Sequence, residues 1–339
     1  MAPKQRHREF GSAIAILAAT LVTACASPQA PAPAQGPQTV EQHRAAAKAA
    51  AGQRFTGLYT ATCGADTPAA TPAPAQPRPT GGGPPDRSQW YAPPQQVFDN
   101  LYWVGTKEHS SWALKTSEGI ILIDTLYNFA VEAEIVDGLK TLGLDPATIK
   151  YVIISHAHGD HDQGAALLQS RYGAKVVMGA PDWDTTVARK TYAGGVARRD
   201  IDAADGQKLT LGDTSVTMIA TPGHTLGTTS LLFPVKDHGS TLTVAYSGGT
   251  AFNFQHTAAR FDTYIASQQK FAKAAAAAGA TVVLSNHSAF DHAAEYAPKA
   301  MQLRADQPHV FAVGKQGVAN YLKVLEECAV ATKTAEFGN

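Results

Sequence analysis

From about residue 96 onward, hydrophobic and polar positions follow two kinds of pattern along the chain. Short runs rich in Val, Ile, Leu and aromatic residues, bounded by Gly, Asp or Asn, predict strands. Stretches with apolar residues at every third or fourth position predict helices. The predicted strands cover residues 98–104, 111–116, 119–124, 151–154, 174–178, 208–219, 229–234, 241–246 and 281–284, with turns at residues 211–213 and 237–239. The predicted helices cover residues 130–142, 163–172, 182–190, 261–278, 293–304 and 318–331.

The order of these elements predicts an α/β fold. The first strands are joined as antiparallel hairpins, later strands are mixed with helices, and β-rich and α-rich parts recur in each half. A four-layer αβ/βα sandwich fits this order better than a doubly wound sheet. We expect one catalytic domain over residues 96–339, which is long enough to bury a large core.

The first 25 residues have the composition of a targeting signal. A basic start is followed by the apolar stretch 10–24, which is too short to span a membrane comfortably. The four residues that end at Cys25 resemble a bacterial lipobox, so we predict a lipoprotein-type signal peptide over residues 1–25 and lipidation of Cys25. Ordinary secretion is the alternative, because the same residues also fit a small-x-small cleavage site. Both interpretations place the protein outside the cytoplasm, and the first predicts a membrane-anchored protein of the periplasm.

Residues 26–95 are rich in Pro, Ala and Gly and predict a tether that contains a short helix over residues 40–55. The chain has three cysteines. If Cys25 is lipidated, parity leaves Cys63 and Cys328 to form a disulfide in an oxidising compartment. Two free thiols are the alternative.

The charge balance indicates which class of partner the protein binds. The formal net charge is +0, and no basic stripe follows the N-terminus. This argues against nucleic acid as the main partner. We expect a small-molecule substrate, a monomeric protein, and contact with the membrane through the lipid anchor only.

Most of the candidate metal ligands lie in the loop after the predicted strand 151–154. Residues 156–161 read His-Ala-His-Gly-Asp-His, and neutral imidazole and carboxylate are zinc ligands. So short a loop cannot easily direct all four side chains at one ion, which predicts two ions. Two further histidines, His224 and His287, each follow a predicted strand. Six ligands allow two three-ligand sites with open positions, an arrangement typical of a catalytic zinc centre.

At these residues the sequence resembles the metallo-β-lactamase superfamily, over about residues 96–331. The resemblance is carried by the H-x-H-x-D-H signature together with Gly223-His224 and the late His287. It implies two zinc ions per chain. The ligands of the first zinc would be His156, His158 and His224, and those of the second Asp160, His161 and His287. It also implies that Asp124 orients the imidazoles of the loop.

Two positions indicate the branch of the superfamily that the chain resembles. Diiron members carry Glu where this chain has His158. Thioesterases of the glyoxalase II type and many lactonases carry an Asp that bridges both metals, and lactamases of subclasses 1 and 2 carry a Cys. Here the matching position is Gly249, which offers neither group. The chain therefore most resembles the class B subclass 3 metallo-β-lactamases.

This resemblance implies a zinc-dependent hydrolase in which a dizinc-activated hydroxide opens the β-lactam ring, with Asp160 as the catalytic residue that orients the nucleophile and relays its proton. The alternatives are a periplasmic metallo-hydrolase that acts on a lactone or ester, and a non-catalytic zinc-binding lipoprotein. Polar side chains near the predicted ligands are candidate substrate contacts: Ser247, Thr250, Asn253, Ser288 and His109.

Overall fold

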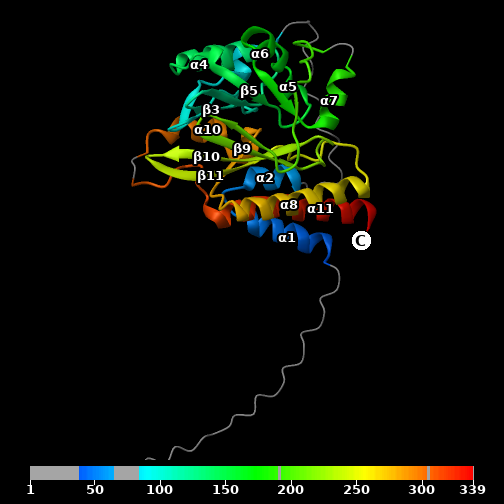
Figure 1. The fold of residues 1–339 in the computed structure, drawn as a ribbon. Coiled ribbons are helices and arrows are strands. Elements are labelled where there is room, and N and C mark those ends of the chain that lie inside the picture. Colours follow the sequence, from blue (N-terminus) through cyan, green and yellow to red (C-terminus); the bar gives the residue numbers. More distant parts are fainter. Residues whose placement is uncertain (1–37, 65–83, 190–191, 304–305, 339) are drawn as a thin grey trace, which may run out of the picture. The chain divides into compact units, whose positions relative to one another are not determined.

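The computed structural model describes residues 38–64, 84–189, 192–303 and 306–338, which belong to one compact unit (Figure 1). The predicted signal peptide, Cys25 and the start of the predicted tether lie outside the described residues. Within the described ranges, every helix is too short or too polar to cross a membrane.

The first sheet has seven strands among the described residues, in the order β1 to β7. Antiparallel pairing joins the strands that come first in the chain: β1 (Gln95–Phe98), β2 (Leu101–Trp103), β3 (Trp112–Thr116) and β4 (Gly119–Ile123). Parallel pairing adds β5 (Ile149–Ile153), β6 (Lys175–Met178) and β7 (Ile201–Asp202). The predicted strand 98–104 contains β2 and only the last residue of β1, with which β2 forms a hairpin. Its turn includes Asn100, whose side-chain oxygen accepts a hydrogen bond from Lys236 N of the other sheet.

The second sheet follows in the chain and has five described strands. Its antiparallel part consists of β8 (Lys208–Leu211), β9 (Thr214–Ala220), β10 (Thr229–Asp237) and β11 (Ser240–Ser247). The last strand, β12 (Val282–Ser285), pairs parallel to β11. The turns between β8 and β9 and between β10 and β11 lie where the sequence predicted them.

The two sheets pack face to face and form the central core. Buried side chains of both sheets meet there, among them Trp112 of β3 and Phe233 of β10. Helices α4 (Asp137–Thr141) and α6 (Ala165–Tyr172) cover the outer face of the first sheet, where Leu139 and Leu168 are fully buried. Helices α8 (Ala258–Ala277) and α11 (Gly314–Phe337) cover the outer face of the second sheet (Figure 1). The predicted four-layer αβ/βα sandwich is confirmed.

Shorter helices complete the described chain. The predicted helix 130–142 begins as the π-helical turn η1 (Val131–Val136), continues as α4, and ends before Gly143, whose φ is +73°. The remaining short helices are α3 (Arg87–Trp90), η2 (Pro146–Thr148), α5 (Gly159–Asp162), α7 (Ala180–Val187), α9 (Ser288–Asp291) and α10 (Ala293–Ala300).

Residues 38–64 form part of the helical layer and not a tether. Helix α1 (Val40–Ala51) begins with a capping box between Thr39 and Gln42, and α2 (Thr56–Thr62) follows it. Helix α1 lies along α11. The small alanine side chains of α1 allow the two helices to approach closely. Ala47 is fully buried in this contact. The structure therefore does not support a domain boundary at residue 96. An alanine-rich stretch does not reveal from its sequence that it packs on a helix far along the chain.

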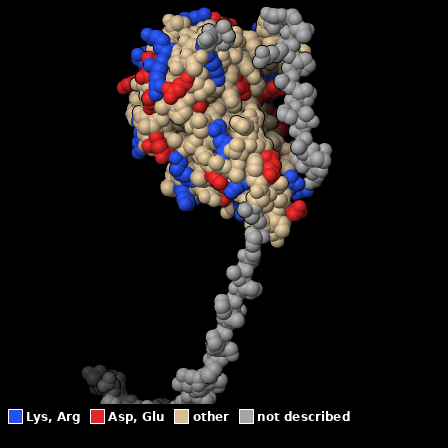
Figure 2. All heavy atoms as spheres, turned by 90° about the vertical axis from the view of Figure 1, so that its right-hand side faces the viewer, with Lys and Arg blue, Asp and Glu red and all other residues tan. Residues whose placement is uncertain are grey.

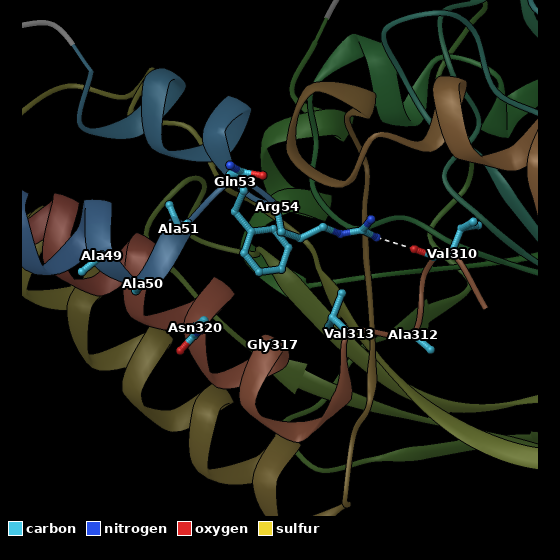
Figure 3. Close-up of a pocket in the computed structure, with 12 residues that line it drawn as sticks. Ala49, Ala50, Ala51, Gln53, Arg54, Val310, Ala312, Val313, Gly317 and Asn320 are labelled. Atoms are coloured by element: carbon cyan, nitrogen blue, oxygen red, sulfur yellow. Dashed lines mark hydrogen bonds between the residues drawn. The ribbon is translucent and has the colours of Figure 1, made fainter. Parts of the chain in front are cut away.

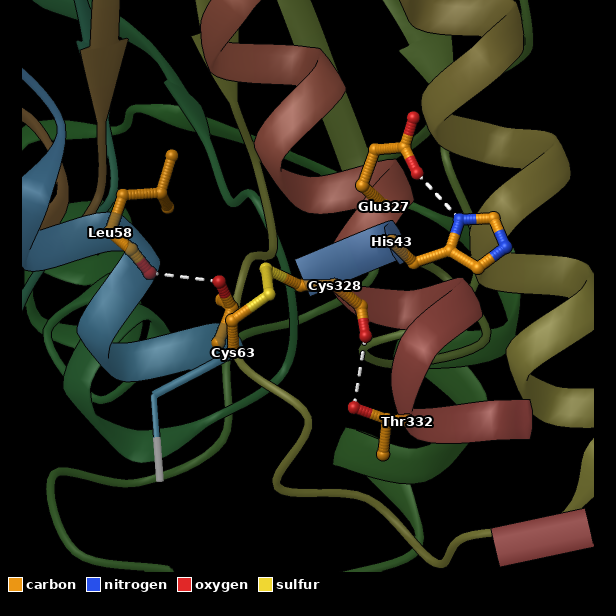
Figure 4. The surroundings of a disulfide bond; sticks show 7 residues. His43, Leu58, Cys63, Glu327, Cys328 and Thr332 are labelled. Atoms are coloured by element: carbon orange, nitrogen blue, oxygen red, sulfur yellow. Dashed lines mark hydrogen bonds and ion pairs between the residues drawn. A yellow bond between two sulfur atoms is a disulfide. The ribbon is translucent and has the colours of Figure 1, made fainter. Parts of the chain in front are cut away.

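A disulfide fixes this contact (Figure 4). Cys63, at the end of α2, is bonded to Cys328 of α11, as cysteine parity predicted. His43 Nδ1 of α1 lies 2.6 Å from a carboxylate oxygen of Glu327, the residue before Cys328. The N-terminal helices are therefore joined to the last helix both covalently and by an ion pair.

A cavity of about 370 Å³ lies where the connection from α1 to α2 meets the start of α11 (Figure 3). Arg54 extends along it and donates a hydrogen bond of 2.5 Å to Val310 O. The same guanidinium lies 4.4 Å from the centre of the Tyr296 ring. None of the predicted zinc ligands lines this cavity.

Charged side chains of both signs are mixed on the surface of the described part of the chain. Figure 2 shows basic and acidic residues side by side on one face. The whole chain has 28 Lys and Arg and 28 Asp and Glu, so neither sign is in excess.

Candidate metal centre

The predicted ligands come from three loops at the ends of strands and from the short helix α5. His156 and His158 follow β5, His224 follows β9, and His287 follows β12. Asp160 and His161 lie on α5. Because these ends meet at one edge of the two packed sheets, residues far apart in the sequence come together in space.

The first group consists of His156, His158 and His224. His224 Nε2 lies 3.0 Å from His156 Nε2 and 3.1 Å from His158 Nδ1. The other ring nitrogens have carbonyl partners, since His156 Nδ1 donates to Gly248 O and His224 Nδ1 donates to Ala251 O, each at 2.7 Å. Each donated proton assigns the tautomer, so the lone pairs of the two Nε2 atoms face each other.

This arrangement fits a zinc ion. Burial lowers the pKa of His156 well below its usual value and that of His224 to about 3, which keeps both rings neutral. Two buried lone pairs that face each other repel unless a cation lies between them. Tetrahedral donors at about 2.0–2.1 Å from zinc lie about 3.4 Å from one another, which is close to the separations observed here.

The second group contains Asp160, His161 and His287. Asp160 Oδ2 lies 3.1 Å from His161 Nε2 and 3.4 Å from His287 Nε2, and the two Nε2 atoms are 3.2 Å apart. Burial opposes ionisation of Asp160, but the neighbouring histidines, His161 first, hold the pKa of its carboxyl well below the usual range. An ionised carboxylate and two imidazoles at these distances also fit zinc.

His109 lies beside Asp160 and His287 of this second group, although the sequence suggested it only as a substrate contact. Its Nε2 atom lies 3.4 Å from Asp160 Oδ2. A nitrogen of His109, a nitrogen of His287 and a carboxylate oxygen of Asp160 lie within 4.8 Å of one another.

Asp124 lies beneath the metal loop, where the resemblance placed an orienting carboxylate. It is fully buried and has a φ of +61°, a left-handed conformation that is uncommon outside glycine. Its Oδ1 accepts from Ser155 N at 2.7 Å, and its Oδ2 accepts from Ser155 Oγ and Tyr246 Oη, each at 2.8 Å. The same Oδ2 lies 3.1 Å from His161 Nδ1. Asp124 therefore fixes both the backbone of the loop and one ring of the second group.

Asp182 of α7, which the sequence did not single out, links the two loops of the first group. Its carboxylate accepts hydrogen bonds from Ala157 N at 2.8 Å, Thr225 Oγ1 at 2.7 Å and Gly227 N at 2.9 Å. Ala157 separates the two loop histidines, and Thr225 follows His224. Arg189 holds the same loop by donating to Ala157 O at 2.6 Å. No sequence signal marked Asp182, because its partners are distant in the chain.

A cavity of about 350 Å³ opens at the metal groups. Of the candidate substrate contacts, Thr250 and Asn253 line it, whereas Ser247, Ser288 and His109 do not. Ser247 Oγ lies 3.2 Å from Thr250 Oγ1, and the buried Ser288 hydroxyl has no hydrogen-bond partner among the described residues. Tyr127, which the sequence analysis did not select, forms part of the wall.

A second cavity of about 330 Å³ adjoins the first and shares Asn253 with it. Its lining includes the side chains of Leu226, Phe254 and Arg260. Leu226 is 60% exposed, which is unusual for a large apolar side chain beside a polar site. The two cavities together offer a polar region at the metal groups and an apolar region beside it.

Comparison with known proteins agrees with the fold. The family model described as "Metallo-beta-lactamase superfamily" matches residues 104–241. This segment contains the metal loop and His224, but not His287.

Two curated relatives are hydrolases of different substrates. A hydroxyacylglutathione hydrolase from Acidiphilium cryptum is 36% identical over 115 residues, which is 33% of this chain and 42% of that protein. The N-acyl homoserine lactonase AttM from Agrobacterium fabrum is 33% identical over 109 residues, which is 29% of this chain and 40% of that protein. The chain therefore spans less than half the length of these relatives.

Similar solved structures extend over more of the chain. BJP-1, a subclass B3 metallo-beta-lactamase of Bradyrhizobium japonicum, is 29% identical with a TM-score of 0.60, covering 72% of this chain and 95% of that one. FEZ-1, a metallo-beta-lactamase from Legionella gormanii, is 25% identical with a TM-score of 0.63, covering 73% and 97%.

Proposed function

Because the chain carries a domain of the metallo-beta-lactamase superfamily, a superfamily of metal-dependent hydrolases, we propose that it is a dizinc enzyme that opens the β-lactam ring. The ligands of the first zinc are His156, His158 and His224. The ligands of the second zinc include Asp160, His161 and His287.

The observation that carries the proposal is the second donor group, which contains a single carboxylate and no bridging one. At Gly249, where lactonases and thioesterases of the superfamily carry a bridging Asp, an added Cβ would lie 2.8 Å from His224 Cβ. The site therefore leaves no room for a bridging side chain at this position. BJP-1, a subclass B3 metallo-beta-lactamase, and FEZ-1, another metallo-beta-lactamase, are similar to this chain over nearly their whole length. Together with the lack of room at Gly249, this similarity favours a β-lactam substrate.

The chain's own residues have distinct roles in this reaction. The zinc ions, when bound, supply an activated water at neutral pH and polarise the scissile carbonyl. Asp160 lines the cavity, where its carboxylate can accept the proton of the attacking water and pass it to the departing ring nitrogen. Thr250 and Asn253 line the same cavity and can donate hydrogen bonds to the substrate.

The second candidate function is hydrolysis of a lactone or thioester. It is supported by the curated relatives, which act on N-acyl homoserine lactones and on hydroxyacylglutathione according to their names. The apolar side chains of Leu226 and Phe254 beside the metal groups would suit an acyl chain.

The proposal includes export to the periplasm and anchoring through a lipid on Cys25. The disulfide between Cys63 and Cys328 supports export, because such bonds persist in oxidising compartments. Within the periplasm the protein acts as a monomer on a small molecule. Mass spectrometry of the mature protein from a bacterial membrane fraction tests the anchor, since a diacylglyceryl group on Cys25 and a chain beginning there are expected.

One substrate panel tests the function. The purified chain, with added zinc, is assayed on nitrocefin, a penicillin, a carbapenem, an N-acyl homoserine lactone and a hydroxyacylglutathione, then again with chelator. We expect zinc-dependent turnover of the β-lactams. Turnover of the lactone or thioester without β-lactam hydrolysis would establish the second candidate instead.

Two variants test the assigned roles. Asp160→Ala should lower kcat by orders of magnitude, because it removes both a zinc ligand and the proton relay. Ser288→Ala should change kcat little, because the Ser288 hydroxyl does not line the cavity. Equal loss in both variants would contradict these roles.

A further inference from the structure

The cavity of about 330 Å³ that adjoins the metal groups is continuous with the cavity at the metals. His158, His224 and Asn253 line both cavities, so the adjoining cavity lies against the first group of histidines. Asp160 lines only the cavity at the metals. The volume is within the range of small-molecule sites, about 300–1,000 Å³. A molecule bound over the first group can therefore extend into a second cavity that Asp160 does not line.

Two apolar side chains, Leu226 and Phe254, form part of the wall of this adjoining cavity. Leu226 is largely exposed, and it lies in the loop that the carboxylate of Asp182 fixes through its two neighbouring residues. The ring of Phe254 packs against that of Phe261, with centres 5.3 Å apart, and the guanidinium of Arg260 lies 5.5 Å from its centre. Both apolar side chains are therefore held in place beside the metal groups.

The charged side chains of the same wall already have partners within the protein. The carboxylate of Asp182 accepts the three hydrogen bonds described above. Arg260 donates to two carbonyl oxygens in the loop of His224, at 2.5 and 3.2 Å. Arg189 forms an ion pair with Asp162 at 3.1 Å. The cavity therefore offers a ligand mainly apolar surface.

The proposed reaction sets the direction in which a substrate lies. Asp160 passes a proton to the departing ring nitrogen, so this end of a β-lactam lies on the side of Asp160. The other neighbour of the scissile carbonyl is the carbon that carries the acylamino side chain in penicillins and cephalosporins. This side chain then extends toward the adjoining cavity. Asn253, which lines both cavities, can donate a hydrogen bond from its amide to the acyl oxygen.

We propose that the adjoining cavity is a subsite for the apolar acyl side chain of the substrate, and that Leu226 and Phe254 select this side chain. The inference rests on the metal-dependent hydrolase of the proposed function and narrows its substrate class. Penicillins and cephalosporins with alkyl or aryl acyl groups fill the subsite, whereas carbapenems, with a hydroxyethyl group on that carbon, do not. N-acyl homoserine lactones carry an acylamino group on the matching carbon, so the subsite suits either candidate function.

A chain-length series tests the subsite. The full chain, with added zinc, is assayed on penicillins prepared from 6-aminopenicillanic acid with straight acyl chains from acetyl to octanoyl. Each CH₂ group that enters the cavity should raise kcat/KM about fourfold, the factor for removing one such group from water. Equal kcat/KM across the series would overturn the subsite and leave β-lactam hydrolysis established.

Leu226→Ser and Phe254→Ser remove the apolar wall from two different loops. The readout is the ratio of kcat/KM between the octanoyl and acetyl penicillins within each variant, because this ratio cancels any general loss of activity. The ratio should fall at least about tenfold in both variants, which corresponds to about two CH₂ groups left in water. Leu226→Met, which keeps an apolar side chain, should retain most of the ratio. An unchanged ratio in either serine variant would overturn the proposal.

Val187→Ser is the matched control. Val187 of α7 is 51% exposed and lines neither cavity, so this variant should keep the ratio of the wild type. An equal fall in the control would overturn the assignment of Leu226 and Phe254.

The outcome for the wild type separates the subsite from the proposed substrate. If the wild type hydrolyses N-acyl homoserine lactones and no penicillin, the β-lactam proposal fails, and the same acyl chains on the lactone decide the subsite: a rise in kcat/KM with chain length supports it, and equal values overturn it. Hydrolysis of neither series would overturn both proposals.

Discussion

At the scale of single residues, two buried carboxylates that are not themselves predicted ligands hold the candidate metal site in place. Asp124 and Asp182 each accept three hydrogen bonds from residues beside the predicted ligands. Asp124 could be predicted, because it ends a buried strand and matches a family position. Asp182 could not, because its function exists only after α7 has packed against two loops that are distant in the sequence.

Asp182→Ala should weaken zinc binding by the first group. The change leaves Ala157 N and Gly227 N without their acceptor, and it disconnects the loop of His156 and His158 from that of His224. We expect a loss of about 10- to 100-fold in zinc affinity, as for partners that orient metal ligands. Chelator competition measures it. Asp184→Ala, two residues along the same helix and paired only at the surface with Arg199, should bind zinc normally. Equal affinity in both variants would contradict this role.

Glu134 makes stability depend on pH. Its side chain is fully buried, Oε1 accepts from Ala92 N at 3.1 Å, and Oε2 has no hydrogen-bond partner among the described residues. Burial raises the pKa of this carboxyl from 4.5 to about 8. Between these values the folded state keeps a proton that the unfolded state releases. The stabilising contribution is therefore complete below the unfolded pKa and is lost as the pH rises through about 8.

Glu134→Gln should remove this dependence. The variant cannot ionise, so its free energy of unfolding relative to the wild type should increase from pH 5 to pH 8, by at most about 1.4 kcal/mol per pH unit. Urea unfolding at several pH values measures this difference in unfolding free energy. Titration of other groups, such as Asp291, contributes equally to both proteins and cancels in the difference. Glu132→Gln, an exposed neighbour paired with Arg171, should show no such trend. A constant difference between wild type and Glu134→Gln would show that Glu134 is ionised throughout.

At the scale of elements, most strands of both sheets were predictable because buried β-branched runs end at turn residues, whereas β1 and β7 were not predicted. The hydrophobic pattern did not predict an element correctly where a contact with a distant part of the chain determined that element. The predicted strand 98–104 is broken near its start, because Asn100 lies in the turn between β1 and β2 and accepts a hydrogen bond from the second sheet. Residues 40–51 pack on α11 through alanines, which are as common on exposed helices as on buried ones. The three loops that carry the candidate ligands follow strands of the structure, as the sequence predicts.

Removing the disulfide between α2 and α11 should lower stability. The bond closes a loop with a sequence separation of 265, for which the chain-entropy model gives about 5.6 kcal/mol. Cys63→Ala and Cys328→Ala should therefore lower the melting temperature by similar amounts, and the double variant should not lower it further. Cys25→Ser, which leaves the pair intact, is the control. An unchanged melting temperature in the single variants would contradict a stabilising role.

At the scale of the whole molecule, the candidate metal ligands come from both halves of the sandwich. His156, His158, Asp160 and His161 follow a strand of the first sheet, whereas His224 and His287 follow strands of the second. A shared pair of ions would link the two sheets at this edge, in addition to the core between them.

Metal removal should therefore destabilise the whole fold. Ligands that bind only the folded state stabilise it by about 4 kcal/mol at a thousand times their dissociation constant. We expect two zinc equivalents by elemental analysis, a lower melting temperature after chelation, and recovery on adding zinc. His287→Ala should hold one zinc less. A single equivalent in the wild type, unchanged in His287→Ala, would contradict the two-site assignment.

The bond between Cys63 and Cys328 also makes the polypeptide a covalent ring with two tails. Almost the entire sandwich, with both metal groups, lies within the ring. A protease that cuts once between these cysteines therefore opens the ring without releasing a fragment. Helices α1 and α2, and any lipid attached before them, stay joined to the catalytic body after such a cut until the disulfide is reduced. A nicked enzyme should accordingly migrate as one band on a non-reducing gel and as two on a reducing gel.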